Sequence, residues 1–187
     1  MNFRAKTILS FVFASLLLWS CKTPEPRKPV SSRSDTFIQK SIKRNKAIVK
    51  DQEKLIKKIV EADSSQQYHT SKNGFWYTYN TAHTEDSITP KVGDEVEFNY
   101  NILSLKNDTI YSSSELGERA VIIDKEDIFS GLRQGLKLMK VNETVTFYFP
   151  SHKAYGYYGD QQKIGKNVPI KSIVTLNKIT KDDTSNN

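Results

Sequence analysis

Polar and apolar residues recur with two different periods along this chain, one typical of helices and one typical of strands. Between residues 36 and 62, apolar side chains return every three or four positions, and lysines occupy many of the positions between them. This spacing predicts a basic amphipathic helix within residues 35–63, with Asp35 as its N-cap and Asp63-Ser64-Ser65 as its stop signal. The apolar stripe consists of Phe37, Ile38, Ile42, Ile48, Val49, Leu55, Ile56, Ile59 and Val60.

The sequence does not determine which surface packs against this apolar stripe. Asn45 and Gln52 interrupt the heptad seam, so a coiled coil is not compelling. The stripe would be buried equally well against the protein's own domain or against a second copy of the chain. Two arrangements are therefore compatible with the sequence: packing of the helix on its own domain, and a homodimer through residues 36–62.

Beyond residue 72 the hydrophobic period falls to two, which is typical of strands. A helical spacing returns only in DIFSGLRQGLKLMK, residues 127–140, where Gly131 and Gly135 predict that the helix backbone lies close against its neighbours. A sheet with one apolar face, covered by one short helix, gives the α+β class. The alternating stretches are GFWYTYN at 74–80, VEFNYNI at 96–102, TVTFYFP at 144–150 and SIVTLNKI at 172–179.

The N-terminal residues follow neither period and resemble an export signal. Arg4 and Lys6 precede an apolar run, Ile8–Cys21, that is short for a transmembrane helix and typical of a signal peptide. Ser20 before Cys21 resembles the bacterial lipobox, in which the cysteine is lipidated after cleavage. The alternative is a plain secretory signal with a chance cysteine.

This interpretation divides the start of the chain into a signal peptide, residues 1–20, and a lipidated Cys21 with a proline-rich tether over 21–34. Several acyl chains would hold the protein stably on a membrane. We therefore expect a lipid-anchored protein of the cell envelope, and Lys22 after the cysteine favours the outer membrane, facing the periplasm.

The net charge of +7 is concentrated in the N-terminal third. Residues 1–63 carry 14 Lys/Arg and six Asp/Glu, whereas residues 64–187 carry 14 and 15. No aromatic residues are interleaved with the basic run, so nucleic-acid binding is not expected. The histidines are scattered and Cys21 is assigned to lipidation, so no metal site, catalytic triad or cofactor is expected.

Two long segments carry a family resemblance. KVGDEVEFNYNILSLKNDTIYSS, residues 91–113, resembles the first core strand of the FKBP-type peptidyl-prolyl isomerases. DIFSGLRQGLKLMKVNETVTFYFPSHKAYGYYG, residues 127–159, resembles their helix, next strand and Ala-Tyr-Gly loop. The resemblance covers residues 73–180 and implies a twisted antiparallel half-barrel sheet wrapped on one short helix, with 181–187 as a disordered tail. The order of lipobox, tether, basic helix and single domain is similar to the gliding-motility-associated isomerase lipoproteins of Bacteroidetes.

The resemblance also implies a site. Tyr155 would be the catalytic phenol that donates a hydrogen bond to the substrate carbonyl, and Leu132 would form the floor, where the family usually has tryptophan. Tyr111 stands where the family has an acid, and Ser172 where it has a wall aromatic. The implied substrate-binding residues are Tyr100, Ile110, Tyr111, Ile128, Phe129, Leu132 and Ile164.

Two functions follow from this resemblance. The first is an anchored isomerase that assists the folding of proline-containing exported proteins, gliding-motility components among them. The second is an anchored chaperone or adaptor that uses the same apolar groove without turnover. An intact Tyr155 favours catalysis, whereas Tyr111 and Ser172 favour binding.

Overall fold

The computed structural model describes residues 31–83, 88–125 and 127–182, with side chains from residue 36 onward. The predicted signal peptide, Cys21 and most of the predicted tether lie outside the described residues. The chain divides into two compact units, residues 1–40 and 41–187, and the sheet and the short helices belong to the second. Within the described part of the chain, no helix combines the length and the apolar character that crossing a membrane requires.

Helix α2 spans Ser31–Ala62 and so extends further toward the N-terminus than predicted. Asp35 lies inside the helix and is not its N-cap, which corrects the predicted start at residue 36. The four residues before Asp35 include no proline or glycine; serine disfavours a helix only weakly, and arginine is a good helix former. At the other end, Asp63 accepts hydrogen bonds from the Ser65 amide (3.0 Å) and the Tyr68 hydroxyl (2.7 Å).

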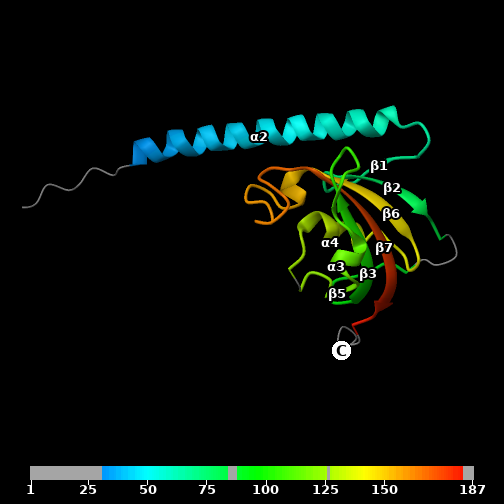
Figure 1. Ribbon diagram of the computed structural model, residues 1–187. Helices are drawn as coiled ribbons and strands as arrows, with labels where there is room; N and C mark the ends of the chain where they lie inside the picture. Colours follow the sequence, from blue (N-terminus) through cyan, green and yellow to red (C-terminus); the bar gives the residue numbers. More distant parts are fainter. Residues whose placement is uncertain (1–30, 84–87, 126, 183–187) are drawn as a thin grey trace, which may run out of the picture. The chain divides into compact units, whose positions relative to one another are not determined.

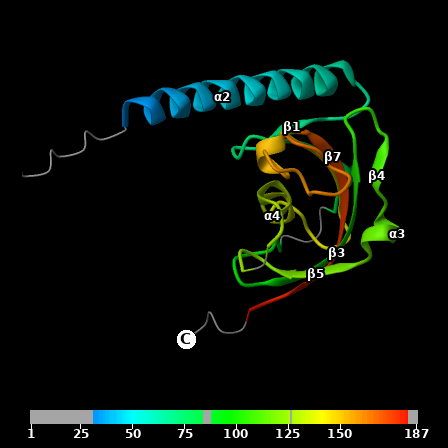
Figure 2. The ribbon, with the colours of Figure 1, turned by 60° about the vertical axis from the view of Figure 1, so that its left-hand side comes forward.

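The second unit contains a seven-stranded sheet in which neighbouring strands are antiparallel. The strand order is β1-β2-β6-β7-β3-β4, with β5 also paired to β3 (Figure 1). The four predicted alternating stretches form the centre of this sheet, and the sheet curls around helix α4 (Figure 2). The α+β class and the half-barrel sheet on one short helix are confirmed. The strands are β1 (His69–Thr70), β2 (Trp76–Thr81), β3 (Glu95–Leu103), β4 (Thr109–Tyr111), β5 (Arg119–Ile122), β6 (Thr144–Phe149) and β7 (Ile170–Thr180); the short helices are α3 (Ser113–Leu116), α4 (Ser130–Leu136) and the 3-10 turn η2 (Ser151–Lys153).

The glycines of α4 bring its backbone against the sheet, as predicted. A Cβ on Gly131 would lie 2.5 Å from Cδ1 of Phe149, and one on Gly135 would lie 2.9 Å from the Phe147 ring. No side chain fits in either gap, so the helix axis approaches the aromatic residues of β6 directly. The helix is shorter than the predicted 127–140 and ends at Leu136, but Leu132 and Leu136 are buried in the core as the spacing requires.

The outer face of the sheet is also partly covered, whereas the sequence predicted a single apolar face covered by one short helix. Tyr148 of β6 points away from α4 and is only 5% exposed, because α2 packs over it. Ile56 and Val60 of α2 are buried in the same cluster, with Trp76 at its edge. The C-terminal half of α2 therefore packs on the protein's own domain, which is one of the two arrangements left open by the sequence.

The domain also extends further toward the C-terminus than predicted. Lys181 and Asp182 were assigned to a disordered tail, but both contact Asp94. Lys181 Nζ lies 2.8 Å from Asp94 Oδ2, and the Asp182 amide donates to Oδ1 at 3.1 Å. Asp94 is buried, and a buried carboxylate needs such donors, which explains why the first two tail residues are held. Residues 183–187 lie outside the described residues.

Candidate functional site

A cavity of about 190 Å³ opens between the curled sheet and the start of α4. It brings together five of the eight residues that the sequence assigned to the site: Tyr155, which was predicted to be catalytic, and four of the predicted binding residues. These residues come from β3, from the stretch before α4, from α4 itself and from the loop after η2. The complete lining is Tyr100, Arg119, Asp127, Ile128, Phe129, Leu132 and Tyr155.

Aromatic packing builds the cavity wall. Phe129 stands at the N-cap position of α4, and its ring centroid lies 5.4 Å from that of Phe149 and 5.2 Å from that of Tyr155. Tyr100 occupies one of the buried positions that alternate along β3, and its ring contacts that of Phe98. Leu132 is only 1% exposed and lies one turn along α4 from Phe129. The aromatic and aliphatic part of the wall forms an apolar cradle whose rings are fixed by contacts with the core, while Arg119 and Asp127 add charged groups to the same lining.

Tyr155 is held by its backbone neighbours. The carbonyl of Ser151 accepts hydrogen bonds from the amides of Ala154 (3.0 Å) and Gly156 (2.8 Å), one on each side of the tyrosine. Gly156 has φ of +62°, a value that glycine adopts without strain. Within residues 31–83, 88–125 and 127–182, no group hydrogen-bonds to the Tyr155 hydroxyl, so this donor is available to a ligand carbonyl.

Burial keeps the Tyr155 hydroxyl protonated. Burial is the largest cause that raises its pKa above the ordinary value near 10, and the nearby Tyr100 and Asp160 raise it further. The pKa of Tyr100 is also raised by burial, against a small opposing effect of Arg119. At neutral pH both phenols are therefore neutral, and the Tyr155 hydroxyl can donate a hydrogen bond.

Tyr111 of β4 and Ile164 of the loop that carries Tyr155 do not line this cavity. Both are buried in the main core. The Tyr111 hydroxyl donates to Asp160 Oδ2, and the amide of Ile164 donates to Oδ1 at 2.7 Å. Ile110 is half-buried against the same core and is also absent from the lining. Their contribution to substrate binding stays a prediction.

Asp160 supplies a carboxylate close to the position at which Tyr111 replaces the acid of the family pattern. Burial raises the pKa of Asp160, but hydrogen bonds from the Tyr111 hydroxyl and from the Gln162 and Ile164 amides outweigh it, so the net pKa is below its ordinary value. The same hydrogen bond is the largest cause of the raised pKa of Tyr111. The site loop thus carries an ionised acid.

Ser172 is not a wall residue. Its side chain is fully buried, and its hydroxyl donates to the Asn101 carbonyl at 2.7 Å. In the register of β3 and β7, Ser172 lies opposite Ile102, whereas Val174 lies opposite Tyr100. The family resemblance placed the wall aromatic at position 172, but the residue of β7 that pairs with Tyr100 is Val174, two positions later.

Sequence reasoning missed three charged residues at this site. Arg119 and Asp127 line the cavity, and Asp160 belongs to the loop that carries Tyr155. Arg119 belongs to β5, a four-residue strand whose apolar pattern is too short to predict. Asp160 follows Gly159, which is a turn signal, but nothing local indicates that its carboxylate reaches Tyr111, 49 residues earlier.

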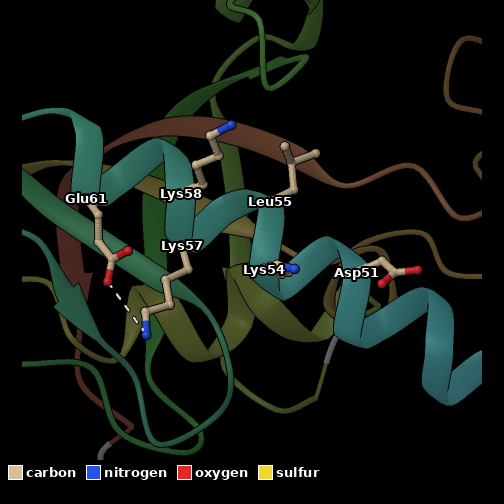
Figure 3. A pocket seen from close by; sticks show the side chains of 6 residues that line it. All are labelled: Asp51, Lys54, Leu55, Lys57, Lys58 and Glu61. Atoms are coloured by element: carbon tan, nitrogen blue, oxygen red, sulfur yellow. Dashed lines mark ion pairs between the residues drawn. The ribbon is translucent and has the colours of Figure 1, made fainter.

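A second hollow, of about 540 Å³, lies on the exposed side of α2 (Figure 3). All six lining residues come from this one helix, and Lys57 and Glu61 form an exposed ion pair at 3.6 Å. A hollow with a single helical wall and solvated charges has no second surface to enclose a ligand, and we assign it none. The residues are Asp51, Lys54, Leu55, Lys57, Lys58 and Glu61.

Comparison with known proteins gives one family match. Residues 86–177 match the family model described as FKBP-type peptidyl-prolyl cis-trans isomerase. A curated protein of Neisseria meningitidis serogroup B, described as the probable FKBP-type peptidyl-prolyl cis-trans isomerase FkpA, is 34% identical over 71 residues. These residues are 38% of this chain and 26% of that relative, so the match spans about a quarter of the relative's length.

Two solved structures have folds similar to that of this chain. A peptidyl-prolyl cis-trans isomerase of Pseudomonas syringae has a TM-score of 0.58 at 18% identity, over 73% of this chain and 96% of that chain. FkpA of Escherichia coli has a TM-score of 0.57 at 19% identity, over 96% of this chain and 74% of that chain. At these identities the likeness shows the fold.

Proposed function

Because residues 86–177 belong to the FKBP-type peptidyl-prolyl cis-trans isomerase family, we propose that this protein catalyses rotation about peptide bonds that precede proline. The observation that carries the proposal is the hydroxyl of Tyr155, available as a donor above a cavity walled by Phe129 and Leu132. Rotation about this bond crosses a barrier of roughly 18–20 kcal/mol and takes tens of seconds without a catalyst.

The proposed mechanism needs no covalent step. A planar amide places negative charge on its oxygen by resonance, and twisting removes that charge, so an apolar cradle favours the twisted state over the planar one. The proline ring would lie against Phe129 and Leu132, and Tyr155 would donate to the carbonyl that turns. A thousandfold acceleration corresponds to about 4 kcal/mol. One neutral hydrogen bond contributes about 1 kcal/mol, so the cradle supplies most of the effect.

A proline-limited refolding assay tests this proposal. Full-length protein should accelerate the slow refolding phase of a substrate whose rate is set by a prolyl bond, in proportion to its concentration. It should also accelerate the cis-to-trans step of a proline tetrapeptide. Absence of acceleration on both substrates, with the protein shown to be folded, would refute the catalytic proposal.

We also propose that the protein is a lipoprotein of the cell envelope, anchored through Cys21. The sequence supports this with a basic start, a short apolar run and a small residue before the cysteine. Cys21→Ser should move the mature protein from the membrane fraction to the soluble envelope fraction or leave an unprocessed precursor. Mature Cys21→Ser protein that still sediments with the outer membrane would contradict the anchor.

The clients that we propose are exported envelope proteins with exposed prolines. The order of signal, tether, basic helix and single domain supports this, and it makes gliding-motility components the first clients to test. Crosslinking in cells, with the Cys21→Ser protein as the control, would identify them.

One observation favours a second candidate, an anchored chaperone that binds without turnover. Tyr157 and Tyr158 follow the catalytic tyrosine and are 47% and 74% exposed, respectively, so they can contact a client outside the cavity. Under this alternative a client would bind while no prolyl peptide is turned over, and Tyr155→Phe would leave the affinity unchanged.

We further propose that two copies pair through the N-terminal part of the apolar stripe. Phe37 (72%), Ile38 (49%) and Ile42 (42%) are exposed, which is costly for an isolated helix in water. Sedimentation of the full-length protein should then show a dimer, and Ile42→Lys should shift it toward a monomer.

A further inference from the structure

Gln52 is a polar residue in the buried part of the α2 stripe. Its side chain is 8% exposed, and Ile56, one turn later, is completely buried. An apolar residue at position 52 would dock the helix at least as well, because burying an amide requires that all its hydrogen bonds be replaced. Docking alone therefore does not explain the glutamine.

Both ends of the Gln52 amide are occupied by groups from one loop. The backbone amide and the hydroxyl of Ser151 each donate to Oε1 at 2.9 Å. Nε2 donates to the carbonyl of Asn167 at 2.7 Å. These partners are the two ends of the segment 151–167, which includes the catalytic tyrosine.

The same two partners are bonded to the neighbours of Tyr155. The Ser151 carbonyl accepts from the Gly156 amide at 2.8 Å, and the Gly156 carbonyl accepts from the Asn167 amide at 2.9 Å. The bonds form a closed ring through Gln52, Ser151, Gly156 and Asn167. Gly156 directly follows Tyr155, so the ring fixes the backbone from which the phenol extends.

We propose that Gln52 is a positioning residue, which holds the loop 151–167 so that the Tyr155 hydroxyl stays above the cavity. This inference rests on the proposed isomerase function. Gln52 lies on α2, outside the cavity lining, and acts only through the loop. The helix would then contribute to turnover even of short peptides, without contacting them.

The first test compares three variants of the full-length protein on a proline tetrapeptide. Gln52→Leu removes the hydrogen bonds and keeps the bulk, so kcat should fall about two- to fivefold while KM stays within about twofold, because the apolar cradle is intact. Gln39→Leu changes an exposed glutamine of the same helix and should alter neither. Ile56→Val weakens docking alone and should lower the melting temperature without changing kcat.

The second test asks whether Gln52 acts through Tyr155. In a Tyr155→Phe background, Gln52→Leu should have no further effect on kcat, because the hydroxyl that it positions is gone. Ser151→Ala removes one of the two donors to Gln52 Oε1 and keeps the Ser151 amide and the bond to Asn167, so its kcat should lie between those of the wild type and Gln52→Leu. A loss of kcat that persists undiminished in the Tyr155→Phe background would overturn the proposal.

A third measurement separates this inference from the proposed function. The hydrogen-exchange rates of the Gly156 and Asn167 amides measure how stable the closed ring of hydrogen bonds is, and they need no substrate. Gln52→Leu should speed exchange at both amides, and Gln39→Leu should not. If the wild-type protein lacks turnover, the isomerase proposal fails, but faster exchange would still support the positioning role. Unchanged exchange in Gln52→Leu would overturn it in either case.

Discussion

The two helices that pack on the sheet make contact in different ways. Helix α4 lies inside the curl and approaches β6 through bare glycine backbone, so its contact is short, apolar and closely fitted. Helix α2 covers part of the outer face through side chains such as Ile56 and Val60, and the buried amide of Gln52 bonds to the loop 151–167. The inner helix shapes the cavity wall, whereas the outer helix reaches the loop that carries Tyr155. Under the role proposed for Gln52, the site depends on a helix that contributes no atom to its lining.

The largest expected effect comes from the outer contact. Ile56→Ala removes a completely buried side chain from the α2 cluster and should lower the free energy of unfolding by about 2–5 kcal/mol. Urea denaturation of the full-length protein measures this, with Leu55→Ala, which is 48% exposed, as the control in the same helix. An effect no larger than that of Leu55→Ala would mean that α2 adds little to the domain.

The inner contact should tolerate even one methyl group poorly. Gly131→Ala places a carbon 2.5 Å from Phe149 and 2.7 Å from the Lys153 carbonyl oxygen, so something must move. We expect a loss of about 1–3 kcal/mol in the free energy of unfolding, despite the better helix propensity of alanine. The control is Gly165→Ala, whose new carbon would come no closer than 3.7 Å to Val168. A stabilised Gly131→Ala protein would show that the close approach is not required.

The cavity itself is tested by a single hydroxyl. Tyr155→Phe keeps the ring packed on Phe129 and removes a hydrogen bond of about 1 kcal/mol, which predicts about a five- to tenfold fall in kcat/KM on a proline peptide. Tyr158→Phe, which alters a 74% exposed phenol of the same loop, should leave kcat/KM unchanged. Equal losses in both variants would point to the loop as a whole instead of the Tyr155 hydroxyl.

The smallest expected effect is a pH dependence of the loop. The folded-state pKa of Asp160 is below its ordinary value near 3.9, so its stabilising contribution is present above pH 4 and is lost as the pH falls below it. The urea midpoint of the wild type should fall in this acid range more steeply than that of Asp160→Asn. The difference between the two curves isolates this carboxylate, and parallel curves would show that it contributes nothing.

Local patterns in the sequence predicted the inner side of the molecule well. Period-two stretches became the central strands, and Gly131 and Gly135 marked a close approach because only a missing Cβ explains glycine inside a helix. The cavity residues Tyr100, Phe129 and Tyr155 were implied by the resemblance of two segments to the isomerase family, and the structure places them around one cavity. All these signals lie within a few residues of the feature that they predict.

The outer side was predicted less well, because its contacts join distant residues. In the sequence, Gln52 only interrupts the apolar stripe of a helix, and its hydrogen-bond partner Ser151 lies 99 positions later. Asp160 likewise meets Tyr111 across 49 positions. Asp35 has the chemistry of an N-cap, but that preference is worth about 1 kcal/mol and did not set the start of α2. No periodicity in a single sequence encodes such pairings.

The separation between α2 and its partners has a consequence for the order of folding. The first described helix of the chain hydrogen-bonds to Asn167, which is 115 positions further along. At a synthesis rate of about 5–20 residues per second, that partner follows roughly 6 to 23 s later. Trp76 and Tyr148, on which the stripe of α2 packs, are made before Asn167, but the hydrogen bonds of Gln52 cannot be completed until Asn167 is present. The helix made first thus receives its last hydrogen-bond partner only when the loop of Tyr155 is complete.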